Sequence, residues 1–149
     1  QRLVDTLHSD PRRSRAAALS MIPTSTGAAK AVGLVLPDLK GKLDGTSIRV
    51  PTANVSVVDF KFNSLRPTTS FEINQALRQA SEKTLNGVLG VVEVPLVSCD
   101  FNHDPHSSIV DLDQSQVVGE KFCRVLAWYD NEWGFSNRML DVAGIIQRL

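Results

Sequence analysis

The sequence lacks several features that would assign it to a specialised class of protein. It has only two cysteines in 149 residues, too few for the disulfide framework of a small secreted domain. Its apolar runs are far shorter than the roughly 20 residues of a membrane-spanning helix. Sixteen basic and sixteen acidic side chains cancel, so no overall field attracts nucleic acid or anionic lipid. We therefore expect a protein of a reducing compartment that binds neither nucleic acid nor membrane.

Signals for a metal or dinucleotide site are also scarce. No GxGxxG motif follows a strand-like segment, so a dinucleotide-binding fingerprint is absent. His103 and His106, with Asp104 between them, superficially resemble a zinc site, but no further ligand cluster follows. A loop of turn-forming residues is the preferred interpretation. Cys99 and Cys123 are interpreted as small buried hydrophobes rather than reactive thiols.

Length and composition favour one globular domain. With 42% hydrophobic and 21% charged residues, the chain is neither disordered nor membranous, and it can bury a substantial core. It begins at Gln1, without methionine or a targeting-like segment. From this beginning we expect a fragment of a longer protein.

Apolar periodicity predicts a mixture of helices and strands. Residues 1–15 read as a long ordered loop, followed by a short turn or strand at 16–21. A first helix is expected at about 27–36, with positions 28, 31, 32 and 35 on its buried side. A second is expected from a capping box at 69–72 to about 83, and a third at about 131–149. Strands are expected at 46–50, 55–63, 89–94, 107–112, 116–118 and 122–128. Because loops and turns join most strands, this order predicts an α+β fold with a mixed, largely antiparallel sheet and helices on one face.

The segment STGAAK at residues 25–30 is the first candidate binding site. Its hydroxyls and the free N–H groups of the following helix would favour an oxyanion such as phosphate. Gly27 indicates a close approach to the backbone. Arginines at 12–15 and Arg49 could bind such an anion bidentately. The alternative is that Ser25 and Thr26 form an ordinary helix N-cap.

A second unusual cluster is YDNEWG at residues 129–134, at the expected junction of a strand and a helix. Asp130 suits the helix N-cap and Glu132 the first turn. Asn131 has no evident structural duty, and its amide could bind a ligand's carboxamide through paired donor and acceptor bonds. The alternative is an ordinary turn asparagine.

Three segments in order carry a family resemblance: PTSTGAAKAVG at 23–33, RVPTANVSVVD at 49–59 and WYDNEWG at 128–134. With them the chain resembles, over essentially all 149 residues, the catalytic domain of the phosphorylating glyceraldehyde-3-phosphate dehydrogenase family. The resemblance implies one catalytic, C-terminal domain at 1–149, with an S-shaped loop at about 1–19 and a C-terminal helix at about 131–149. It also implies an N-terminal Rossmann domain that is absent from this chain.

The resemblance implies an oxidoreductase of glycolysis that converts D-glyceraldehyde 3-phosphate, NAD and inorganic phosphate to 1,3-bisphosphoglycerate and NADH. The enzyme would be a cytoplasmic homotetramer. By the same resemblance, Arg13, Thr26 and Gly27 would bind the attacking phosphate, and Arg49 would bind the phosphate of the substrate. No metal is implied.

The resemblance also implies cofactor contacts. Asn131 would bind the nicotinamide carboxamide, and Phe135 would stand where many relatives have a tyrosine beside the ring. Thr6 and Leu7 replace the Gly-Pro or Leu-Pro of many NAD-using relatives, so NADP stays open as an alternative cofactor.

The family's catalytic residues have no counterpart here. Neither its Ser-Cys-Thr-Thr-Asn segment nor its His-x-Tyr-Thr-Ala-Thr-Gln segment occurs, and Cys99 and Cys123 match other positions. We therefore expect no catalytic residue in this chain and no activity of the chain alone.

Two alternative functions stay open. The segments FNHDPHSS at 101–108 and WGFSNRML at 133–140 also resemble erythrose-4-phosphate dehydrogenase, which uses water in the second step. The STGAA segment at 25–29 favours the phosphorylating enzyme. An alternative of another class is a non-catalytic phosphate-binding or oligomerising fragment.

Overall fold

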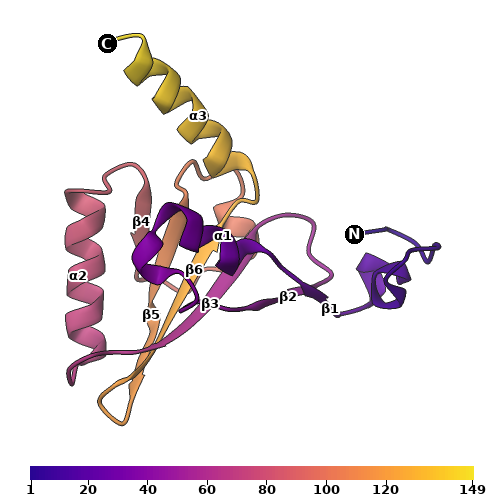
Figure 1. Cartoon of the computed structure of the whole chain (residues 1–149), viewed down its shortest axis with the longest axis horizontal. Helices are drawn as coiled ribbons and strands as arrows, with labels where there is room; N and C mark the ends of the chain where they lie inside the picture. The colour runs from indigo at the N-terminus through magenta and orange to yellow at the C-terminus, as the bar shows by residue number, and fades with distance from the viewer. The chain divides into compact units, whose positions relative to one another are not determined.

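The computed structural model describes residues 1–149, which form two compact units, Gln1–Ala53 and Asn54–Leu149 (Figure 1). The helices are α1 (Ala28–Val35), α2 (Ser70–Glu82) and α3 (Trp133–Ile146). The strands are β1 (Ile22–Ser25), β2 (Thr46–Arg49), β3 (Ser56–Asn63), β4 (Leu89–Val92), β5 (Ser108–Val118) and β6 (Phe122–Tyr129). Short 3₁₀ helices are η1 (Pro11–Ser14), η2 (Ala17–Leu19), η3 (Pro37–Leu39) and η4 (Ser98–Phe101). None of the helices combines the length and apolar composition needed to cross a membrane.

The predicted α+β class is confirmed. In the first unit, β1 and β2 form an antiparallel pair. In the second, four strands lie in the order β3-β6-β5-β4. The β3/β6 and β6/β5 pairs are antiparallel and the β4/β5 pair is parallel, so the sheet is mixed and largely antiparallel as predicted. Helix α2 runs along this sheet (Figure 1) and packs on one face of it through Leu77.

Residues 1–15 form a loop, as the sequence predicts, with η1 within it, and hydrogen bonds close this loop on itself and on Ala16 and Ala17. The Thr6 N–H donates to the Ser14 carbonyl at 2.9 Å, and the Ala17 N–H donates to the Arg2 carbonyl at 2.9 Å. The Asp5 carboxylate accepts from the Ala16 N–H at 2.7 Å. These bonds give a segment with little buried apolar surface a defined path.

Strand β1 was not predicted, because Pro23 argues against a strand. In the structure Pro23 lies opposite Ile48. A proline is tolerated here because β1 has a single neighbouring strand, so one of its edges needs no backbone donors.

Helix α1 lies within a residue of its predicted bounds, but its predicted buried side is wrong. The four apolar positions expected to be buried are all exposed: Ala28, Ala31, Val32 and Val35. Gly33 is the buried residue instead. A Cβ built on Gly33 would lie 3.0 Å from the Lys40 Cα, so α1 meets the following segment through bare backbone rather than through an apolar stripe.

The core of the second unit lies on both faces of its sheet. Val110 pairs with Ala127 on the face that α2 covers. The neighbouring pair, Ile109 and Trp128, belongs to a second cluster with Phe101. Side chains of successive strand residues point to opposite faces, and the Phe101 and Trp128 rings stack at 5.4 Å. Both faces are therefore partly covered.

Most local signals of the second unit are confirmed. The Thr69 hydroxyl and the Glu72 carboxylate form the predicted capping box. Hydrogen bonds from Thr68 and then Arg66 hold the pKa of Glu72 below its ordinary value. The two strands expected at 107–118 are one strand, β5, with a register shift between Asp111 and Gln116. Cys99, expected to be buried, is exposed, because η4 buries Phe101 instead.

Candidate functional site

The start of α1 presents backbone donors that the chain does not use. The N–H groups of Gly27, Ala29 and Lys30 donate to no other group, whereas the Ala28 N–H donates to the Thr26 hydroxyl at 3.2 Å. A Cβ built on Gly27 would meet nothing within 4 Å. Free N–H groups at an open helix start are well suited to bind an oxyanion.

Arg13, the first predicted phosphate ligand, lies in η1, which packs beside β1. Its Nε is buried and has no hydrogen-bond partner. A buried donor without a partner costs free energy that an acceptor would recover. Arg13 forms no ion pair within the chain, so an anion near it would not compete with an internal carboxylate.

A surface hollow of about 480 Å³ lies between η1 and the β1–β2 pair. It is lined by Asp10, Pro11, Arg12, Pro23, Thr24, Ser25 and Thr46. The lining includes the residue before Arg13 and the residue before Thr26. Two of the predicted phosphate ligands therefore follow directly on segments that share one hollow within the first unit.

Arg49 lies at the other end of the same strand pair. It pairs with Ile22, at the start of β1, whereas Ser25, at the end of β1, pairs with Thr46. Three residues of extended strand separate the two positions by about 10 Å. The exposed Arg49 side chain forms no ion pair within the chain. The strand pair therefore separates Arg49 from the start of α1 rather than bringing the two together.

In the second unit, the Asn131 side chain is held on both sides of its amide. Its Nδ2 donates to the Asn54 Oδ1 at 2.7 Å, and its Oδ1 accepts from the Ser56 hydroxyl at 2.6 Å. The residue is nevertheless exposed. An amide carries two donor hydrogens and can accept two bonds, so one donor and one acceptor are left for a ligand. This remainder matches a carboxamide.

Asp130 was predicted to cap the C-terminal helix, and this is wrong. Its buried carboxylate accepts from the Asn54 Nδ2 at 2.9 Å and from the His103 N–H at 2.6 Å. Helix α3 begins at Trp133, after Glu132, with no side-chain cap. Each carboxylate oxygen thus has one donor from another loop, and neither accepts from an N–H of the helix.

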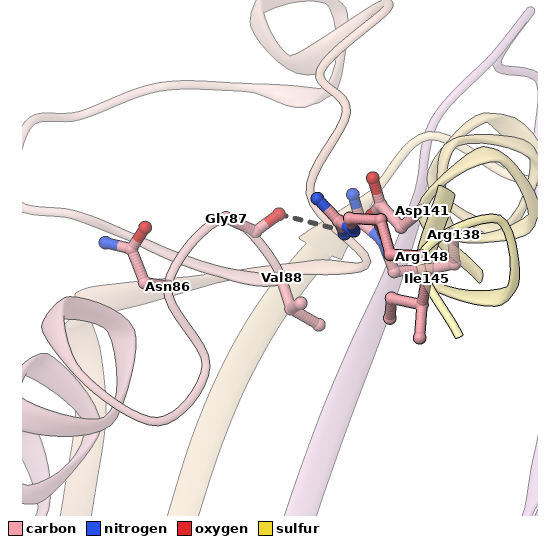
Figure 2. A pocket seen from close by; sticks show the side chains of 7 residues that line it. All are labelled: Asn86, Gly87, Val88, Arg138, Asp141, Ile145 and Arg148. Carbon is pink, nitrogen blue, oxygen red and sulfur yellow. Dashed lines mark hydrogen bonds and ion pairs between the residues drawn. The ribbon is translucent and has the colours of Figure 1, made fainter. Parts of the chain in front are cut away.

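Phe135 lies in the first turn of α3 and is 67% exposed. Gly134 beside it is buried. The same helix is tied to its unit by Arg138, whose Nη1 donates to the Gly87 carbonyl at 3.0 Å (Figure 2). Gly87 and Arg138 line a second surface hollow of about 390 Å³. Asp141 lines it as well, and its Oδ2 lies 2.7 Å from the Arg138 Nε. That arginine is engaged by the chain itself, whereas the Phe135 side chain is exposed on the first turn of the same helix.

The histidine loop forms no group of three potential metal ligands. Nδ1 of His106 lies 2.7 Å from the Asp104 carboxylate. The His103 ring lies 4.9 Å from the Trp133 ring. These side chains are thus engaged within the loop and at the start of α3.

Sequence reasoning missed Asn54 and Ser56 as neighbours of Asn131. They follow the arginine segment at 49–53 as part of the run NVS, and no local periodicity links them to a residue about 76 positions later in the sequence. One further signal exists only in the structure. Val55, between them, has a φ of 71°, which is a strained conformation for a β-branched residue.

Comparison with known proteins places this geometry in a family. The family model described as glyceraldehyde 3-phosphate dehydrogenase, C-terminal domain, matches residues 1–131. A glyceraldehyde-3-phosphate dehydrogenase of Cereibacter sphaeroides is 62% identical over all 149 residues, which cover 45% of that protein. One of Xanthobacter flavus is 61% identical over the whole chain and 44% of its own length. A chloroplastic one of Arabidopsis thaliana is 53% identical over 98% of this chain and 37% of its own length.

The matches cover 98–100% of this chain, and the chain spans less than half the length of these relatives. The family model includes the start of α1, Arg49 and Asn131. The chain belongs to the family of glyceraldehyde-3-phosphate dehydrogenase C-terminal domains.

Proposed function

We propose that this chain is the catalytic, C-terminal domain of an NAD-dependent, phosphorylating glyceraldehyde-3-phosphate dehydrogenase of glycolysis. The S-shaped loop would be residues at about 1–19 and the C-terminal helix residues at about 131–149. A Rossmann domain would lie in another part of the same protein. The names of the relatives support the reaction, in which D-glyceraldehyde 3-phosphate, NAD and phosphate give 1,3-bisphosphoglycerate and NADH.

The observation that carries this proposal is the set of unused donors at the start of α1. The N–H groups of Gly27, Ala29 and Lys30 have no partner, and the Thr26 hydroxyl stands next to them. Together with the unpaired Arg13 Nε, they would bind and orient inorganic phosphate for attack on the acyl group.

Arg49 would bind the phosphate of the aldehyde substrate. Its position at the far end of the β1–β2 pair supports a second anion position instead of a shared one. Two phosphates carry like charges, and a separation of about 10 Å keeps their repulsion small in solvent. The reacting carbon would lie between them.

Asn131 would orient the nicotinamide through its carboxamide, and Phe135 would pack beside the ring. The free donor and acceptor of the Asn131 amide fit that group. When bound, NAD supplies the hydride acceptor. The same residues serve NADP equally well, since they recognise the nicotinamide rather than the ribose.

No residue of this chain is proposed as nucleophile or base. The exposed Cys99 and the buried Cys123 stand at other positions than the family's cysteine. The whole protein would act as a cytoplasmic homotetramer, and this chain alone would not turn over substrate.

The test uses the full-length dehydrogenase that contains this chain. With D-glyceraldehyde 3-phosphate and NAD, NADH formation in successive turnovers should require phosphate or arsenate. Equal rates without either anion would contradict the phosphorylating reaction and favour the erythrose-4-phosphate type, in which water attacks. Failure of the purified full-length protein to reduce NAD at all would favour the non-catalytic alternative.

A further inference from the structure

The amide of Asn131 has two possible orientations of nearly equal shape. A rotation of 180° exchanges its oxygen and its nitrogen, and only the surrounding hydrogen bonds decide between them. The choice matters for binding, because it determines which edge of a ligand amide is accepted. The orientation of the Asn131 amide is determined by hydrogen bonds that begin at a residue it does not contact through its own side chain.

The order of donors and acceptors starts at Asp130. One carboxylate oxygen accepts from the His103 backbone N–H, which can only donate. The other accepts from Asn54, so the Asn54 nitrogen must face Asp130. The Asn54 oxygen then faces Asn131 and accepts its Nδ2. As a result the Asn131 oxygen must point to the Ser56 hydroxyl.

The other neighbours follow this order without setting it. A hydroxyl can donate or accept, so Ser56 would satisfy either orientation of Asn131. The Asn102 Oδ1 accepts from Asn54 at 2.6 Å, and the Asn102 side chain forms no other hydrogen bond, so its amide is free to turn. Among the side chains of Asn54, Ser56, Asn102, Asp130 and Asn131, only that of Asp130 can do nothing but accept.

The backbone around this set is held in unusual conformations. Val55, which follows Asn54, has a φ of 71° and is buried in the cluster with Phe101. Asn131 has a φ of 20°. Positive values of φ in residues other than glycine persist only where the surroundings impose them. Here they bring Asn54 and Asn131 into contact.

We infer that Asp130 and Asn54 are positioning residues that fix which edge of the Asn131 amide donates and which accepts toward the cofactor. This inference rests on the proposed binding of the nicotinamide carboxamide by Asn131. Asp130 does not touch the ligand. It acts through Asn54 alone.

Replacing the carboxylate by an amide has a definite consequence. In Asp130→Asn the new oxygen accepts from the His103 N–H, so the new nitrogen faces Asn54. Asn54 must then turn its oxygen to residue 130 and its nitrogen to Asn131, which inverts the Asn131 amide. The double variant Asn54→Asp with Asp130→Asn restores the original order, since a carboxylate at 54 can only accept from Asn131.

The experiment measures the dissociation constant of NAD by isothermal titration calorimetry in the full-length dehydrogenase, with the melting temperature of each variant as a second readout. Asp130→Asn should weaken NAD binding about 5- to 25-fold, because inversion of the Asn131 amide mismatches both its free donor and its free acceptor. The double variant should return the constant to within about twofold of the original. Asn102→Ala is the matched control and should leave it unchanged.

The variants distinguish the positioning role of Asp130 and Asn54 from the binding role of Asn131. Weakening by Asp130→Asn with recovery in the double variant supports the inference. Unchanged binding in Asp130→Asn, or no recovery in a double variant that melts normally, overturns it. If Asp130→Asn does not fold, the double variant decides alone: binding like the original supports the inference, and weakened binding overturns it. Unchanged binding in Asn131→Ala overturns the proposed role of Asn131 itself and the inference with it.

Discussion

Gly134 lies directly against the backbone of His106: a Cβ built on it would be 2.6 Å from the His106 carbonyl oxygen. This contact sets the start of α3 against the loop that leads into β5. The neighbouring atom is backbone, so it cannot move aside as a flexible side chain would. The first turn of α3, which carries Phe135, can lie this close to the loop because Gly134 has no side chain.

Gly134→Ala should therefore destabilise the protein, although alanine favours helices. We expect a loss of about 1–3 kcal/mol in the free energy of unfolding, the usual cost of overpacking, measured by equilibrium unfolding in urea. Gly144→Ala in the same helix is the control, because a Cβ there meets nothing within 4 Å. It should stabilise by about 0.5–1 kcal/mol. Equal effects at both positions would argue against the close contact.

Asp59 forms ion pairs on the β3–β6 strand pair whose contribution to the free energy of unfolding should depend on pH. Its carboxylate accepts from the Arg124 Nε at 2.8 Å and lies 2.6 Å from the Lys61 Nζ. The Arg124 hydrogen bond, and then that of Lys61, hold the pKa of Asp59 below its ordinary value of 3.8. A carboxylate with a lowered pKa stabilises the folded state above its unfolded pKa, and this stabilisation is lost as the pH falls through the folded pKa.

Asp59→Asn should lower the free energy of unfolding by less than about 1 kcal/mol at pH 7, because the carboxylate is solvent-screened. The difference from the original protein should begin to shrink as the pH falls below 3.8 and should vanish only below the lowered pKa of the folded state, as measured by urea titrations over pH 2 to 7. Asp113→Asn is the matched control, since the exposed Asp113 on the same sheet forms no ion pair. A difference that persisted unchanged in acid would contradict the charge-based account.

The capping box of α2 gives a prediction on local stability. The Thr69 hydroxyl accepts from the Glu72 N–H at 3.2 Å, and its removal leaves a helix donor without a partner. Thr69→Ala should cost about 1 kcal/mol of unfolding free energy, whereas Thr69→Ser should cost much less. Circular dichroism during urea unfolding provides the measurement, and equal loss in both variants would show that the hydroxyl is not responsible.

Much of the second unit could be predicted from sequence because its signals are local. The capping box, the alternation along β3 and the length of β6 each depend on residues within a dozen positions of one another. Phe60 and Phe62, for example, stack at 5.3 Å on one face, as their spacing requires.

The remaining features depend on contacts between distant residues. Pro23 argues against a strand until its single neighbour is known. Asp130 stands at a position in the sequence that is typical of a helix N-cap, yet its two carboxylate oxygens accept hydrogen bonds from Asn54 and His103. At the candidate site, a local pattern predicts Thr26 and Gly27 as ligands, but no such pattern indicates Asn54, since its contact with Asn131 crosses 77 positions.

Arg49 is expected to act on one substrate only. In the full-length dehydrogenase, Arg49→Ala should lower kcat/KM for the phosphorylated aldehyde about 10- to 100-fold, mainly through KM, as expected for the loss of a charged hydrogen bond. The KM for inorganic phosphate should change little. Unchanged kinetics with the aldehyde would contradict the role of this arginine.

The central claim is that the start of α1 binds the attacking phosphate while Arg49 binds the phosphate of the substrate. The most direct measurement compares both KM values in Thr26→Val, which removes the hydroxyl but keeps the shape of the side chain. We expect its KM for inorganic phosphate to rise about 5- to 10-fold, with the KM for D-glyceraldehyde 3-phosphate within about twofold of the original. An unchanged KM for inorganic phosphate, or a rise in the KM for the aldehyde alone, would contradict the account.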